Sequence, residues 1–176
     1  NEVSRAPSGD EPFAAFVYKT LADPYAGKLT LFKVLSGTLK ADSGFFNASR
    51  EAKERCGNIF LLQGKKQISV PQVTAGQIAA VAKLKETSTG DTLTAEGKPF
   101  ILPPPDLPEP ALSYAIKPKS KGDEEKVSQS LSRLLDEDPS LRVRRDDATK
   151  ENILSGMGQQ HIEVTVERLK NKFGVE

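Results

Sequence analysis

The chain has 176 residues, of which 37% are hydrophobic and 28% are charged, and its formal net charge is +1 at pH 7. This composition is that of a globular protein with one ordinary domain or two small ones, and no stretch approaches the roughly 20 apolar residues that span a bilayer. The single cysteine, Cys56, excludes an internal disulfide and a multi-cysteine zinc site, and it suits a reducing cytosol.

The first half of the chain carries short β-rich runs separated by turn residues. They are KLTLFKVLSG from Lys28, TLKADSGFFNAS with a turn at 42–44, NIFLLQGKKQISV across Gly64, and GQIAAVAKL from Gly76. This spacing predicts an antiparallel barrel or sandwich. The segment REAKERCG before Asn58 could form one helical turn, but we interpret it as a continuation of the strands.

A proline-rich segment divides the chain. The stretch ILPPPDLPEPALS, residues 101–113, holds five of the twelve prolines. Proline removes a backbone donor and restricts the residue before it, so this stretch can form neither a helix interior nor a central strand. We expect it to be a stiff linker between two domains.

The second half changes to a mixed pattern. Residues 111–119 and the segments LRVRR and ENILSG predict three strands, and residues 122–139 and 158–173 predict two helices. The order β-α-β-β-α is that of a ferredoxin-like split βαβ domain lacking one strand, which residues 174–176 would begin. The apolar positions of the two helices are Val127, Leu131, Leu134 and Leu135 in the first, and Ile162, Val166, Leu169 and Phe173 in the second.

Four stretches resemble elongation factor G, the ribosomal translocation GTPase. They are ADPYAGKLTLFKVLSGTLKADS, LKETSTGDTL, the segment from Pro108 to Val143, and ILSGMGQQHIEVTVERLKNKFGVE. The resemblance implies a second domain, an antiparallel β-barrel, at residues 1–106 with its ordered core at about 12–102. It also implies a third, ferredoxin-like α+β domain at 107–176, with its last strand truncated. The chain begins with Asn1, and we expect it to be a fragment whose parent carries a GTPase domain before it and two more domains after it.

Catalytic motifs are missing from the sequence. A phosphate-binding loop needs G-x-x-x-x-G-K-[ST], and the Gly-Lys pairs at residues 27, 64 and 97 are followed by Leu29, Lys66 and Pro99. His161 and Glu163 lie two residues apart and would face different sides of a helix, which disfavours a metal pair. We therefore expect no catalytic, cofactor-binding or metal-binding residue in the fragment, and no enzyme activity; GTP and Mg²⁺ would bind to the parent's GTPase domain.

The only histidine, His161, follows a Gly-Met-Gly turn and opens a helix. A positive charge is disfavoured in the first turn, so we expect a neutral imidazole that forms hydrogen bonds or packs locally. In the resembled family this corner faces the GTPase domain and borders the pocket of the antibiotic fusidic acid. The resemblance therefore implies an interdomain coupling surface made by Met157, Gln159, Gln160 and His161.

The resemblance also implies partners. We expect a monomeric cytoplasmic fragment that contacts the small-subunit RNA and protein of the ribosome, and its own GTPase domain in the parent, but no membrane. The candidate RNA contacts are Lys28, Arg50, Lys53 and Arg55. Relatives usually have Glu-Leu where this chain has Gln159-Gln160, so a ribosome-recycling or specialised paralogue is the alternative. A free-standing RNA-binding protein is disfavoured, because LRVRR and ENILSG lack the aromatic residues on which bases stack.

Overall fold

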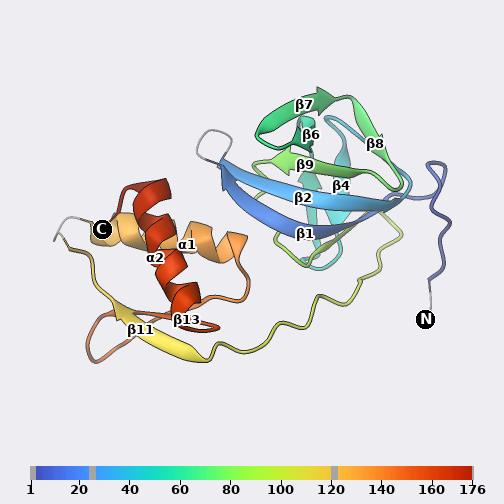
Figure 1. Cartoon of the computed structure of the whole chain (residues 1–176). Helices are drawn as coiled ribbons and strands as arrows, with labels where there is room; N and C mark the ends of the chain where they lie inside the picture. The colour runs from blue at the N-terminus through green and yellow to red at the C-terminus, as the bar shows by residue number, and fades with distance from the viewer. Residues whose placement is uncertain (1–2, 24–26, 120–122, 176) are drawn as a thin grey trace. The chain divides into compact units, whose positions relative to one another are not determined.

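The computed structural model describes residues 3–23, 27–119 and 123–175. The chain divides into two compact units, residues 1–105 and 106–176. The first unit is built of strands, and the second combines a small sheet with two helices (Figure 1). No helix among the described residues is long and apolar enough to cross a membrane.

An antiparallel sheet of eight strands forms most of the first unit, and β4 lies behind β1 and β2 in the view of Figure 1. A separate two-stranded pair joins β3 (Thr38–Lys40) to β8 (Gln72–Thr74). In spatial order the eight strands are β5 (Ala52–Arg55), β4 (Gly44–Asn47), β10 (Thr92–Thr94), β1 (Ala14–Asp23), β2 (Gly27–Ser36), β9 (Ile78–Ala82), β6 (Ile59–Gln63) and β7 (Lys66–Val70).

Backbone hydrogen bonds draw the two ends of this sheet together. The N–H of Ala41 donates to the carbonyl of Pro71 at 2.8 Å, and the N–H of Asp42 donates to Gly57 at 3.3 Å. These bonds join the turn before β4 to residues that follow β7 and β5. The predicted antiparallel barrel is confirmed, because closure satisfies donors that an open sheet would leave at its edges.

Alternation along the strands separates a packed interior from an outer face. Ala15 and Val17 of β1 and Phe32 and Val34 of β2 are buried in the interior, together with Ala79, Val81 and Leu93. Cys56 lies in the same core with no exposed surface. Burial raises the pKa of the Cys56 thiol, and this effect exceeds the lowering effect of backbone hydrogen bonds there.

The strand β1 is the main element that the sequence patterns did not predict. It pairs with both β10 and β2 and so occupies a central place in the sheet. Its register with β2 shifts between Val17 and Lys19, and this irregularity breaks the simple alternation that would mark a strand. The interpretation of residues 50–57 as strand is confirmed by β5 (Ala52–Arg55).

The second unit has the predicted order β-α-β-β-α, and its ferredoxin-like class is confirmed. Its antiparallel sheet has the order β11–β13–β12, and both helices lie on one side of it in Figure 1. Val127, Leu131 and Leu134 of the first helix pack with Leu154, Ile162 and Leu169 in one core. The elements are β11 (Leu112–Ile116), α1 (Glu124–Glu137), β12 (Arg142–Arg145), β13 (Asn152–Gly156) and α2 (Gln159–Phe173).

Two details of the second unit differ from expectation. The helical spacing places Val166 on the buried face of α2, but Val166 is 45% exposed, and Thr165 is buried instead because it shares a face with Ile162 and Leu169. The expected strand at 174–176 is also wrong for the two residues described there. Gly174 has φ +62° and donates its N–H to Lys170, and Val175 donates to Leu169, so these two residues cap α2. Glu176 lies outside the described residues.

The proline-rich segment between the units has no regular structure until β11 begins at Leu112. Its start is attached to the barrel, because the N–H of Leu102 donates to Thr92 Oγ1 at 3.0 Å. The prolines correctly predicted the absence of a helix or strand before Leu112, and the role of this stretch as a stiff linker stays a prediction.

Candidate functional site

A sharp corner connects β13 to α2. The strand ends at Gly156, and a Cβ at this position would lie 3.2 Å from both Nδ1 of His161 and Cγ1 of Ile162. A side chain here would therefore push His161 or Ile162 away. The helix begins at Gln159, as the sequence predicted, with Gly158 as its N-cap residue.

His161 ties this corner together through both ring nitrogens. The backbone N–H of Met157 donates to Nδ1 at 3.1 Å, and Nε2 lies 2.9 Å from Oδ2 of Asp138. A ring that accepts at Nδ1 and donates at Nε2 is a neutral imidazole. The side chain reaches back from the third helical position to a backbone N–H before the helix, as the glutamate of a capping box does.

Asp138 brings the end of α1 to the same corner. Its backbone N–H donates to Leu134 at 2.9 Å, and its Oδ1 accepts the N–H of Ser140 at 3.0 Å. Partial burial acts to raise the pKa of Asp138, but hydrogen bonds from Ser140 and His161 outweigh it and hold the pKa below its usual value. The carboxylate thus stays ionised and orients the imidazole.

The other members of the predicted coupling set surround His161. Met157 is half-buried, and Gln159 and Gln160 are exposed in the first turn of α2. The Nε2 of Gln159 donates to Oε1 of Glu163 at 2.8 Å. The four residues therefore lie at one corner, and their role in interdomain coupling stays a prediction. Among the described residues, no three His, Cys, Asp or Glu side chains gather to hold a metal ion.

Three of the four candidate RNA contacts lie around β4 and β5. Lys53 and Arg55 are two residues apart on β5, so they share one face of the strand, and Arg50 lies in the turn just before it. Lys28 is on β2, three strands away from β4 in the sheet, and does not join this group. Nε of Arg55 donates to the carbonyl of Asp42 at 3.1 Å.

Acidic partners hold two of these basic side chains in place. Nε of Arg50 lies 3.3 Å from Asp91, and Nζ of Lys53 lies 3.0 Å from Glu96. Lys53 and Glu96 are both mostly exposed, so this pair contributes little to stability. Asp91 is 4% exposed, and its pairing with Arg50 belongs to a larger buried network.

This buried network around Asp91 is not apparent from the sequence. Oδ2 of Asp91 accepts Asn47 Nδ2 and the N–H of Ser88, each at 2.9 Å. Glu54 accepts the N–H groups of Lys85 and Glu86. The network therefore fixes the loop between β9 and β10 against the β4–β5 turn. The polar run TSTGD, residues 87–91, was the one feature of the sequence that could have indicated such a network.

Two family models match consecutive parts of the chain. Elongation factor G domain 2 matches residues 12–96, and elongation factor G domain III matches residues 107–176. The chain carries the second and third domains of the elongation factor G family. A crystal structure of a protein from Thermus thermophilus is also similar, with a TM-score of 0.83 and 32% identity over 96% of this chain. The chain spans 25% of that protein's length.

The two family matches assign the two candidate sites to different domains of elongation factor G. The Asp91 network and the basic side chains around β5 belong to domain 2, and the corner at His161 belongs to domain III. Each site is held by hydrogen bonds within its own domain. Substitutions at one site can therefore be tested independently of the other.

The lowered pKa of Asp138 in domain III predicts a pH effect on stability. Because the folded-state pKa lies below the unfolded value of about 3.9, the ionised group stabilises the fold above that pH. The stabilisation is lost as the pH falls through the folded-state pKa. We expect Asp138→Asn to lower the free energy of unfolding by about 1 kcal/mol at pH 7 and to flatten its pH dependence in the acid range.

Urea denaturation between about pH 2.5 and pH 7 measures this effect across the range where the carboxylate titrates. Asp147→Asn is the matched control, because Asp147 is exposed in the turn between β12 and β13. An Asp138→Asn variant with the same acid dependence as the Asp147→Asn variant would contradict the role given to the hydrogen bonds that Ser140 and His161 form with Asp138.

Proposed function

We propose that the chain is the ribosome-binding and interdomain-coupling part of a GTPase that acts in GTP-dependent ribosomal translocation. The observation that carries the proposal is the match to elongation factor G domains 2 and III in consecutive order along the chain. In this proposal GTP and Mg²⁺ bind to a GTPase domain of the parent, and the parent is a cytoplasmic protein. The fragment itself is a monomer without catalytic residues.

The basic side chains around β5 would contact ribosomal RNA. Arg50, Lys53 and Arg55 are exposed, and their intramolecular partners fix where their charges lie. Phosphate contacts of this kind position a protein without reading the base sequence. Their number sets the salt dependence of binding.

Reversing two of these charges should weaken ribosome binding. We expect Lys53→Glu with Arg55→Glu, in the full-length factor, to lower affinity and to reduce the slope of log K against log salt by about 2, one for each phosphate contact. Lys65→Glu with Lys66→Glu is the matched control, because these exposed residues lie where β6 turns into β7. Binding measured at several salt concentrations tests this, and equal slopes for both double variants would remove Lys53 and Arg55 as contacts.

The corner at His161 would couple domain III to the GTPase domain. We expect His161→Ala in the full-length factor to leave nucleotide affinity unchanged and to lower ribosome-stimulated GTP turnover about fivefold or more. A fivefold change corresponds to a coupling free energy of about 1 kcal/mol, the lower end of the usual range. Glu167→Ala, in an exposed position further along α2, is the control. Turnover equal to that of the control would overturn the coupling role of the corner.

A recycling or specialised factor is the second candidate. The resemblance to elongation factor G favours it, because it implies Glu-Leu where this chain carries Gln159-Gln160. These two residues are exposed in the first turn of α2. GTP turnover by the full-length factor, with and without a pre-translocation complex, distinguishes the two. A translocase requires stimulation by that complex, and stimulation only by post-termination ribosomes would favour the second candidate.

A further inference from the structure

The outer face of the barrel carries apolar side chains where alternation would place polar ones. Phe16 of β1, Lys33 of β2 and Ile78 of β9 are direct cross-strand neighbours and form one row. Their sequence neighbours, such as Ala15, Val34 and Ala79, are buried in the core, so this row points outward. Ile78 is 53% exposed and Tyr18 is 41% exposed. Exposed apolar side chains gathered in this way mark an interaction surface.

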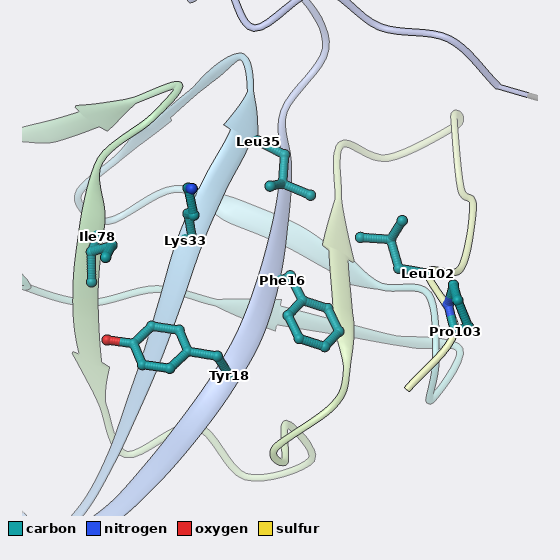
Figure 2. A pocket seen from close by; sticks show the side chains of 7 residues that line it. All are labelled: Phe16, Tyr18, Lys33, Leu35, Ile78, Leu102 and Pro103. Carbon is teal, nitrogen blue, oxygen red and sulfur yellow. The ribbon is translucent and has the colours of Figure 1, made fainter. Parts of the chain in front are cut away.

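These side chains line an open trough of about 510 Å³ (Figure 2). Figure 2 shows Ile78, Lys33 and Phe16 on neighbouring strands, with Leu102 and Pro103 beyond Phe16. Leu102 and Pro103 form one side of the trough, and the hydrogen bond from the Leu102 N–H to Thr92 Oγ1 holds them against the barrel. Ligand-binding hollows in proteins have volumes of about 300–1,000 Å³.

Lys33 is the single charged side chain in this lining. Among the described residues, no hydrogen bond or ion pair joins its ammonium group to a partner. Partial burial raises the pKa of the nearby Tyr18 hydroxyl, which therefore remains a neutral hydrogen-bonding group. An unpaired cation among apolar side chains favours an anionic group on a ligand that is otherwise apolar.

The lining distinguishes a peptide from a nucleic acid. A single-stranded nucleic acid needs a groove with several cations to follow its phosphates, in addition to aromatic rings that stack on its bases. This trough offers one cation, and most of its other lining is aliphatic or proline. An interface built of apolar anchors with a few placed polar groups is typical of peptide and protein recognition.

We propose that this trough binds a peptide segment of a partner protein in which apolar side chains adjoin a carboxylate. The apolar side chains would lie along Phe16, Tyr18 and Ile78, and the carboxylate would accept hydrogen bonds from Nζ of Lys33. This binding site is separate from the proposed ribosome contacts around β5 and does not depend on them.

The test uses two probes that differ in one charge. N-acetyl-leucyl-phenylalanine carries a carboxylate, and its C-terminal amide does not. We expect both to shift amide signals of residues 16–18, 33–35 and 78 in NMR titrations of the ¹⁵N-labelled chain, with the amide binding about tenfold more weakly because one charge-assisted hydrogen bond is lost. Lys33→Gln should abolish the difference between the probes, and Ile78→Ser should weaken both.

Lys19→Gln is the matched control, because Lys19 is an exposed lysine of β1 outside the trough. It should keep the full preference for the acid. Equal binding of acid and amide, or no binding of either, would overturn the proposal. Tighter binding of hexa-adenylate to the same residues would assign the trough to nucleic acid instead, and self-association that protects Ile78 would assign it to a second copy of the chain. Either result would also overturn the peptide assignment.

Discussion

Replacing Gly37 with alanine should lower the free energy of unfolding of the barrel by about 3 kcal/mol or more. Gly37 connects β2 to β3 with φ +72°, a conformation that strains a residue with a side chain. A Cβ here would also lie 2.5 Å from the carbonyl oxygen of Glu11 and from the backbone of Phe13. Because these are backbone atoms, relief would require the segment before β1 to move.

Gly76→Ala separates the two causes. Gly76 has φ +88°, but a Cβ there would meet no atom within 4 Å. This control carries the conformational strain without the clash, so we expect a loss of about 1 kcal/mol. Urea denaturation of both variants measures the difference. Equal losses would show that the segment before β1 yields without cost and that the close approach at Gly37 does not stabilise the barrel.

Asp91→Ala should have an effect of similar size, about 3 kcal/mol. The carboxylate is buried, and its removal leaves the N–H of Ser88 and one of the two amide N–H groups of Asn47 without an acceptor, since Thr87 Oγ1 accepts only the other. Arg50 also loses its ion pair. Unsatisfied buried donors are costly because they no longer bond to water either.

Glu96→Ala provides the comparison for Asp91. It removes the ion pair with Lys53, in which both side chains are mostly exposed, so we expect a loss of at most about 0.5 kcal/mol. Thermal or urea denaturation measures both variants. A loss for Asp91→Ala as small as that for Glu96→Ala would mean that water satisfies the donors around Asn47.

Local patterns predicted most of the elements, and the exceptions have physical causes. The helices and strands of the second unit follow from helical spacing and from turn residues such as Pro139 and Gly158. The strand β1 did not stand out because its register shift near Tyr18 disturbs the alternation. The exposure of Val166 depends on how α2 is rotated about its axis against the sheet. The spacing of apolar residues in one sequence does not define that rotation.

The candidate sites depended more on contacts between distant residues. Sequence alone placed His161 at the start of a helix and predicted a neutral imidazole, and the hydrogen bond that Met157 donates to the ring agrees with this. Its partner Asp138 is 23 residues away, at the end of the other helix, and no local pattern joins them. The Asp91 network and the trough also form only when strands far apart in the sequence become neighbours.

The burial of Cys56 makes the two units separately measurable. It is the only cysteine of the chain, and it lies in the barrel core without exposed surface. A thiol reagent can therefore modify it only when the barrel opens, whereas unfolding of the second unit leaves no cysteine to label. Pulsed thiol labelling across a urea gradient would report the unfolding of the barrel alone. Circular dichroism reports the unfolding of both units, so subtracting the barrel transition from it would give the stability of the second unit within the intact chain.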